Sequence, residues 1–129
     1  MKQMKPEDMF PRSFNRLTEG KYILKYRKPL PCDNLKKWGT WFKNAHRRVR
    51  GTQINNNIFV STVFLGLDHG WNSDVPILFE TMIFKNGTGE DCYRCATWKQ
   101  ALKQHWFAVE YCRKAKECIG LIPDGLVAV

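Results

Sequence analysis

The residues Ile58-Phe59-Val60-Ser61-Thr62-Val63-Phe64-Leu65-Gly66-Leu67 decide the fold of this chain. The stretch is dense in β-branched and aromatic residues, and it is too short and too uniformly apolar for a surface helix. It therefore predicts a β-strand covered on both faces. Residues 77–84, ILFETMIF, have the same character, and the turn-rich stretch 68–75, DHGWNSDV, separates the two. We expect an antiparallel hairpin with a long loop, formed by residues 58–67 and 76–84.

A helix is predicted before this hairpin, over residues 33–50. Asp33 is suited to accept the free amides of the first turn, and Gly51 is suited to end the helix. Spacings of three and four residues lay one apolar stripe along it, made of Leu35, Trp38, Phe42, Ala45 and Val49. The stripe predicts that this helix packs on the sheet.

A second helix is predicted after the hairpin, over residues 97–116. Thr97 and Gln100 have the spacing of a capping box, in which each side chain satisfies a free backbone donor. The apolar stripe then consists of Trp98, Leu102, His105, Val109 and Cys112. Two shorter features complete the prediction: a short edge strand over residues 21–28, and a turn over residues 86–89, NGTG.

These elements predict an α+β fold, a small antiparallel sheet around a central β-hairpin with two packed helices. At 129 residues the chain has the length of a single domain, residues 1–129. Residues 1–20 show no periodicity and are expected to be a flexible arm. Residues 119–129 form an apolar tail, which we expect to pack on the core or to meet a partner.

Composition narrows the class of protein. Apolar residues make up 43% of the chain, yet no apolar run approaches the roughly 20 residues of a membrane span. The first ten residues, MKQMKPEDMF, lack the apolar segment of a secretory signal. The odd number of cysteines, five, fits reduced thiols better than a disulfide framework. We therefore expect an intracellular protein with no membrane partner.

The charge is uneven along the chain. The formal net charge is +9, and residues 1–50 carry 14 Lys/Arg against 4 Asp/Glu. Residues 51–90 are acidic by comparison, with 1 Lys/Arg against 4 Asp/Glu. Such asymmetry is typical of a surface that meets polyanions, so nucleic acid or an acidic host protein is the expected partner.

The predicted first helix supplies the candidate polyanion-binding residues. The candidates are the cations of its polar face and the arginine at its end: Lys36, Lys37, Lys43, Arg47, Arg48 and Arg50. These side chains are suited to follow a phosphate backbone, and an exposed Trp41 or Trp71 is suited to stack on a base. The alternative is that the charged face is merely solvated. No known signature for reading a nucleic-acid sequence is present.

Four polar residues form the candidate enzymatic set: Asp68, His69, Glu80 and His105. Glu80 and His105 stand where apolar residues are expected, and a buried polar group needs a partner. If the four converge, they can bind a divalent metal or divide acid and base roles. The alternative is structural: Asp68 caps its turn, Glu80 pairs with Arg or Lys, and His105 bonds the backbone.

Cysteines offer a weaker candidate for a metal site. Cys92 and Cys95 have the spacing of a zinc-binding pair, and His105 and Cys112 follow downstream. However, His105 and Cys112 are seven residues apart on one predicted helix, about 10 Å along its axis, so they cannot readily share one ion. We therefore expect no metal and no other cofactor.

Three blocks of the sequence resemble small uncharacterised proteins found widely in tailed-phage genomes. The blocks are STVFLGLDH at 61–69, LFETM at 78–82, and RCATWKQA at 94–101 followed by His105. The chain departs from that pattern with Cys95 in place of a tyrosine and Ala96 in place of a serine. The resemblance implies a phage-encoded accessory protein in the host cell cytoplasm, and it implies no mechanism.

Three functions follow from these patterns. The first is a non-enzymatic binding module that acts on a host or nucleic-acid component, in host takeover or defence evasion. The second is a small metal-dependent hydrolase or nucleotide-handling enzyme that uses the four polar residues. The third is a homo-oligomeric interaction protein whose C-terminal tail docks between subunits.

Overall fold

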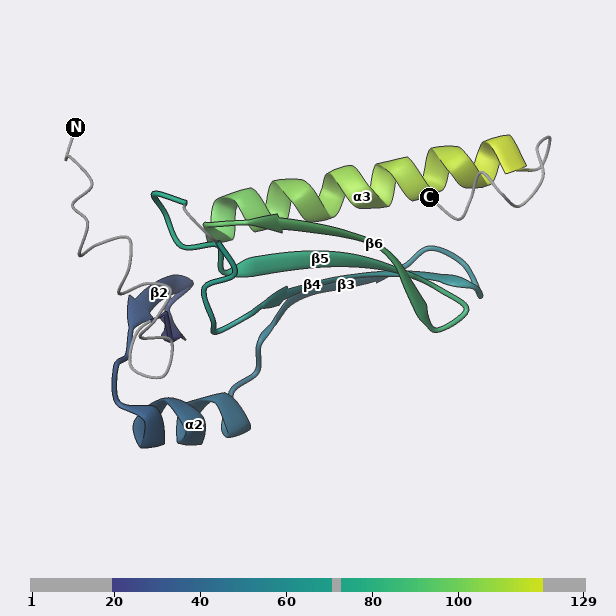
Figure 1. Ribbon diagram of the computed structural model, residues 1–129. Coiled ribbons are helices and arrows are strands. Elements are labelled where there is room, and N and C mark those ends of the chain that lie inside the picture. Colours follow the sequence, from purple (N-terminus) through teal and green to yellow (C-terminus); the bar gives the residue numbers. More distant parts are fainter. Residues whose placement is uncertain (1–19, 71–72, 120–129) are drawn as a thin grey trace. The chain divides into compact units, whose positions relative to one another are not determined.

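The computed structural model describes residues 20–70 and 73–119 (Figure 1). The elements in chain order are β1 (Tyr22–Lys25), β2 (Lys28–Pro31), α2 (Leu35–Asn44), β3 (Arg48–Gln53), β4 (Ile58–Phe64), β5 (Phe79–Lys85), β6 (Thr88–Cys95) and α3 (Trp98–Ile119). The two sheets and two helices confirm the predicted α+β class. The arm and the tail predicted at the two ends lie, apart from residues 20 and 119, outside the described residues.

The described chain divides into two compact units. Residues 20–46, 65–70 and 73–78 belong to the first unit, and residues 47–64 and 79–119 belong to the second. The first unit holds β1, β2 and α2, and the second holds the four-stranded sheet and α3.

The sheet of the second unit has the order β3-β4-β5-β6, and every neighbouring pair is antiparallel. The predicted central hairpin is confirmed, since β4 pairs with β5 over its whole length, from Ile58 opposite Lys85 to Phe64 opposite Phe79. The strands are shifted from the predicted ranges. Residues 65–78, which the prediction divided between strand and loop, belong to the first unit.

Strand β6 was not predicted, because it is an edge strand made largely of polar residues, TGEDCYRC. The turn predicted before it, over residues 86–89, is confirmed at Asn86 and Gly87, whereas Thr88 and Gly89 belong to β6. Asn86 and Gly87 both have positive φ, 54° and 84°, and they connect Lys85 to its partner Thr88. Asn-Gly in this conformation is the two-residue turn whose twist matches a right-twisted hairpin.

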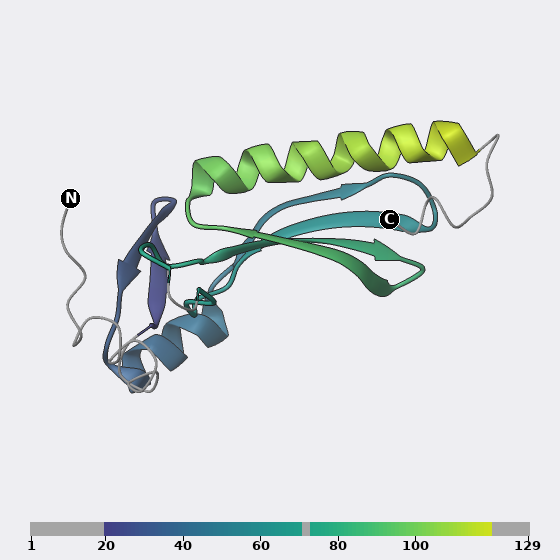
Figure 2. The same cartoon turned by 45° about the horizontal axis from the view of Figure 1, so that its top comes forward.

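Helix α3 lies along one face of the four-stranded sheet (Figure 2). Its sheet-facing residues recur at spacings of four and three and are Ala101, His105, Ala108, Cys112 and Ala115. Small alanines allow the helix to approach the strands closely, and Ala108 and Cys112 join Val60 and Ile83 in the core. Within the described ranges, no helix is long and apolar enough to cross a membrane.

The capping box at the start of α3 is confirmed. The Gln100 Oε1 accepts hydrogen bonds from the backbone N–H of Ala96 at 3.0 Å and of Thr97 at 3.1 Å. In return, the Thr97 Oγ1 accepts the backbone N–H of Gln100 at 3.1 Å. Both side chains therefore satisfy donors that the helix leaves free at its first turn.

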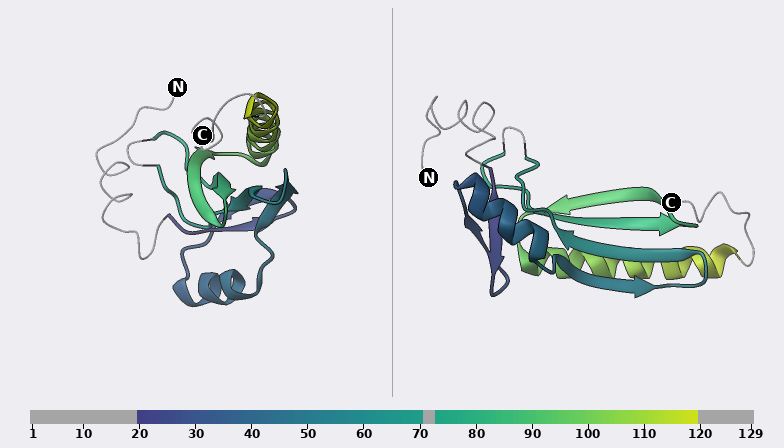
Figure 3. Two further views of the ribbon diagram at one scale, coloured as in Figure 1. Left: turned by 90° about the vertical axis from the view of Figure 1, so that its right-hand side faces the viewer. Right: turned by 90° about the horizontal axis from the view of Figure 1, so that it is seen from below.

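The predicted helix 33–50 is wrong in its second half. Helix α2 ends at Asn44, and Ala45 already has extended backbone, with ψ 148°. The following residues form β3, which pairs with β4 and lies beside it in the sheet (Figure 3). Ala45 and Val49 are four residues apart, a spacing that fits one face of a helix and one face of a strand equally well. The strand is favoured because it forms hydrogen bonds to an edge of β4 that would otherwise be unpaired.

The first unit contains a small hairpin and a helix that packs against it. The single strand predicted at residues 21–28 is instead the pair β1 and β2, joined at Tyr26 and Arg27, which have φ values of 51° and 69°. The N-cap of α2 is Asn34 and not Asp33, since the Asn34 Oδ1 accepts the Lys37 N–H at 2.9 Å.

A glycine allows α2 to approach the loop after β4. Gly66 has φ +79°, and a Cβ there would lie 2.9 Å from Cε1 of Phe42. The Trp38 Nε1 donates to the carbonyl of Gly66 at 3.1 Å and to that of Tyr22 at 3.1 Å. A side chain at position 66 would therefore strain the backbone and separate these contacts.

We expect Gly66→Ala to lower the free energy of unfolding by about 1–3 kcal/mol, because φ is unfavourable and the space is filled. Gly39→Ala is the matched control, since Gly39 lies within α2 and a Cβ there meets nothing within 4 Å. This control should stabilise the protein by about 0.5–1 kcal/mol. Urea unfolding measures both. Equal stability of the two variants would contradict the tight approach at Gly66.

Candidate nucleic-acid interface

An arginine and a tryptophan stack together at the edge of the second unit. The Arg50 Cζ lies 5.1 Å from the centroid of the Trp106 ring. Arg50 comes from the edge strand β3 and is exposed, and Trp106 comes from α3 and is 41% exposed. A cation over an indole face is attracted by the ring quadrupole, so each side chain holds the other in an ordered, accessible position.

A bulge in β3 directs this arginine. The pairing of β3 with β4 shifts register between Arg48 and Arg50. A bulge of this kind changes the direction in which side chains leave the strand. Arg48 lies over Phe59, 5.3 Å from the ring centroid, whereas Arg50 reaches Trp106 on the helix side.

Exposed cations lie on the same side of α3 as Trp106. With 100° per residue, Lys99 and Arg113 stand two turns before and after Trp106, and Lys103 stands about one turn before it. Lys114 is also exposed. The exposed carboxylate of Glu110 stands one turn after Trp106 on the same side. The four exposed cations outnumber it, so the surface around Trp106 carries a net positive charge.

Three large aromatic side chains of α3 are exposed: Trp106 at 41%, Phe107 at 68% and Tyr111 at 37%. They stand outside the sheet-facing row of the helix. Exposed large apolar side chains that gather on one element mark a binding surface more often than single ones do. We call this set, with Arg50, Lys99, Lys103, Arg113 and Lys114, the basic–aromatic surface.

The predicted polyanion-binding residues are divided between the two units. Lys36, Lys37 and Lys43 are exposed on α2, as predicted. Arg47, Arg48 and Arg50 are not helical, and Arg47 donates from Nη1 to the Phe64 carbonyl at 3.1 Å. The six residues therefore do not form one helical face. Trp41 is half-buried, and Trp71 lies outside the described residues.

Sequence reasoning missed the cations and rings of α3. The signal was present, because Trp106, Phe107 and Tyr111 fall between the members of the apolar stripe of that helix. Large apolar residues off the stripe of an amphipathic helix are expected to face solvent.

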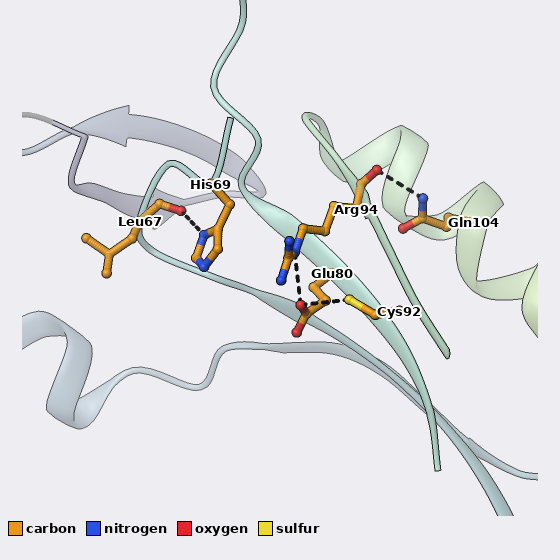
Figure 4. Close-up of polar contacts among 6 residues, drawn as sticks. All are labelled: Leu67, His69, Glu80, Cys92, Arg94 and Gln104. Atoms are coloured by element: carbon orange, nitrogen blue, oxygen red, sulfur yellow. Dashed lines mark hydrogen bonds and ion pairs between the residues drawn. The ribbon is translucent and has the colours of Figure 1, made fainter. Parts of the chain in front are cut away.

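Asp68 and His69, the first half of the enzymatic set, lie in the first unit. The Asp68 Oδ1 accepts the backbone N–H of Gly70 at 2.8 Å and of Ile77 at 2.9 Å, so Asp68 stabilises its turn. The His69 Nδ1 donates to the carbonyl of Leu67 at 2.8 Å (Figure 4). Asp68 therefore stabilises its turn as the structural alternative expects, and His69 bonds the backbone of its own loop.

Glu80 pairs with neighbouring residues of β6. One carboxylate oxygen, Oε2, accepts from the Arg94 Nε at 3.0 Å and from the Cys92 thiol at 3.0 Å (Figure 4). The Gln104 Nε2 donates to the backbone carbonyl of Arg94 at 3.3 Å, which links β6 to α3. Glu80 is thus held in an ion pair, as the structural alternative predicts.

His105 is fully buried, with 0% of its surface exposed, between α3 and the sheet. Its Nδ1 shares a hydrogen bond of 2.8 Å with the Thr62 hydroxyl, and its Nε2 shares one of 2.8 Å with the Thr52 hydroxyl. Thr62 in turn bonds the Thr81 hydroxyl at 2.7 Å. Burial, and secondly the positive charge of Arg50, lower the pKa of His105 to about 4.

Glu80 and His105 therefore do not meet. His105 bonds to Thr62 and thus lies on the sheet face of Thr81, and successive residues of a strand point to opposite faces. Glu80 consequently projects from the face opposite α3. At neutral pH the imidazole is uncharged and both of its nitrogens are occupied, which fits a structural role. The prediction that His105 bonds the backbone is wrong, since its partners are two threonine hydroxyls.

Cys92 and Cys95 also point to opposite faces of the sheet. Met82 is paired with Cys92 and Phe79 with Cys95, and these two β5 residues are three apart. Burial, and for Cys92 also its bond to Glu80, raises the pKa of each thiol to about 11. Two thiols on opposite faces of one sheet cannot both reach one ion, so this pair is poorly suited to bind metal. The described residues contain no group of three or more potential ligands.

Comparison of the chain with protein-family models, with curated proteins and with solved structures finds no match.

Proposed function

We propose that this protein is a non-enzymatic accessory protein that binds nucleic acid through the basic–aromatic surface of β3 and α3. The observation that supports it most is the stack of Arg50 on the exposed Trp106 ring, at 5.1 Å, among the exposed lysines and arginines of α3. Phosphates and bases are the ligand groups that match cations and exposed rings together.

The charge of the second unit supports the same ligand. Its described residues include ten Lys/Arg against five Asp/Glu, a net charge of +5. A surface of this sign releases counterions from a phosphate backbone on binding, which favours association with any sequence. The candidate enzymatic residues, in contrast, are held in contacts that stabilise the fold.

The resemblance of the three sequence blocks to tailed-phage proteins supports a role for this protein during phage infection. A small basic phage protein in the host cytoplasm would meet host or phage nucleic acid directly. We therefore place its action in host takeover or defence evasion. An acidic host protein is the alternative partner, because it would be attracted by the same charges.

The charge of the surface provides the test. We expect the double variant Arg50→Glu/Arg113→Glu to bind a labelled 20-nucleotide DNA at least about 10-fold more weakly than the unmodified protein in fluorescence anisotropy. The slope of log K against log salt should become shallower by about 1.5, because roughly two phosphate contacts are lost.

The matched control is Lys36→Glu/Lys37→Glu on α2, which makes the same change of charge at exposed positions. This variant should keep most of the affinity, apart from the general loss of positive charge. A larger loss in the control than in the Arg50 variant would place the interface on α2. The absence of any salt-sensitive complex would contradict the proposal and favour a protein partner.

A further inference from the structure

We infer that the nucleic acid is single-stranded and that its bases stack on Phe107 and Tyr111 of α3. This inference rests on the proposed function and names the form of its ligand. It starts from two rings that the fold leaves exposed, at 68% for Phe107 and 37% for Tyr111.

The two rings share one side of α3. They are four residues apart, which places them on neighbouring turns about 6 Å apart along the helix axis. Lys103 stands one turn before Phe107, and Lys114 stands about one turn after Tyr111, and both are exposed. The row therefore offers two rings and two cations beside one exposed carboxylate, Glu110, which stands one turn before Lys114. Bases that stack on the rings would place their phosphates within reach of the lysines.

A single strand fits this row better than a duplex does. In a duplex the bases are stacked on each other, so a helix on the outside meets phosphates and groove edges and the rings stay without a stacking partner. An unpaired strand offers free base faces, and stacking on aromatic side chains tolerates any sequence. This tolerance agrees with the absence of a base-reading signature in the sequence.

The charge of the row favours nucleic acid over an apolar protein surface. Protein interfaces are enriched in aromatic residues but depleted in lysine. Here lysines stand at both ends of the ring pair, and the sequence of α3 has five Lys/Arg against two Asp/Glu, Glu110 and Glu117. An occupant with negative charge and flat apolar groups therefore complements the row best.

Three probes of equal length test the inference by fluorescence anisotropy with the full chain. They are a single-stranded DNA of 20 nucleotides, its duplex, and an abasic strand that keeps the phosphates without bases. We expect the single strand to bind about 10-fold or more tightly than the abasic strand and the duplex at equal salt. Phe107→Ala and Tyr111→Ala should each remove most of this preference and leave abasic binding unchanged.

Phe107→Leu separates stacking from apolar contact, because leucine keeps the apolar surface and lacks the ring. It should bind the single strand as weakly as Phe107→Ala does. Two results would overturn the inference that bases stack on these rings: equal affinity of the unmodified protein for all three probes, or full affinity of Phe107→Leu for the single strand. Either result would leave the proposed function standing. If the protein binds none of the three probes at low salt, both the inference and the proposed function are overturned, and the row is assigned to a protein partner.

Discussion

Replacement of His105 by alanine is expected to lower the free energy of unfolding by about 3 kcal/mol or more, as for other large-to-small changes in a core. The side chain is fully buried and bonds Thr52 and Thr62 at 2.8 Å each. Its removal leaves a cavity under α3, and it leaves the buried Thr62 hydroxyl and the half-buried Thr52 hydroxyl with fewer partners. Both effects act on the contact that joins the helix to the sheet.

Urea unfolding measures this loss, and Lys103→Ala is the control on the exposed side of the same helix. The control should change stability by less than about 0.5 kcal/mol. His105→Gln is expected to lie between the two, because an amide can replace part of the hydrogen bonding. A His105→Ala protein as stable as the control would show that the threonine network does not anchor α3.

The same residue predicts a dependence of stability on pH. The pKa of His105 is about 4 in the folded protein, against an ordinary value of 6.5, because burial and then Arg50 disfavour the charged ring. The unfolded chain therefore binds the proton first as the pH falls. The stabilisation is complete above pH 6.5 and is lost as the pH falls toward 4, by about 3 kcal/mol.

Chemical denaturation at a series of pH values from 7.5 to 4 measures this loss. His105→Gln provides the reference, since carboxylates also titrate in this range and their contribution is common to both proteins. The difference in unfolding free energy between the two proteins should shrink as the pH falls. Parallel curves would contradict a neutral, buried His105.

The fold was predictable where local pattern and tertiary packing agree. The hairpin of β4 and β5, the Asn86-Gly87 turn and the capping box of α3 were all predicted from short patterns with one physical meaning. In each of these three elements, the residues that determine the structure lie next to one another in the sequence or satisfy each other's hydrogen bonds.

The edge strands were not predictable in this way. Strand β3 carries Arg48, Val49 and Arg50, which continue a helical stripe equally well, and β6 is largely polar. Their strand conformation depends on hydrogen bonds to β4 and β5, which are long-range contacts. Local propensity does not contain that information.

For the candidate site, the sequence predicted the type of residue, cations suited to bind a polyanion, better than the elements that carry them. Arg50 was among the predicted polyanion-binding residues, but its partner Trp106 is distant in sequence and comes from another element. Glu80 and His105 drew attention because they are polar at core positions. The structure gives them partners from other strands, Arg94 for Glu80 and two threonines for His105, and these long-range contacts cannot be read from spacing.

Mapping the bound strand onto the chain tests the proposed interface most directly. A heteronuclear NMR titration with a single-stranded 20-nucleotide DNA reports which backbone amides change on binding. We expect the largest shifts at Arg50 and from Lys103 to Lys114, with the amides of α2 nearly unchanged. Shifts concentrated at Lys36, Lys37 and Lys43, with α3 unaffected, would contradict the assignment of the interface to β3 and α3.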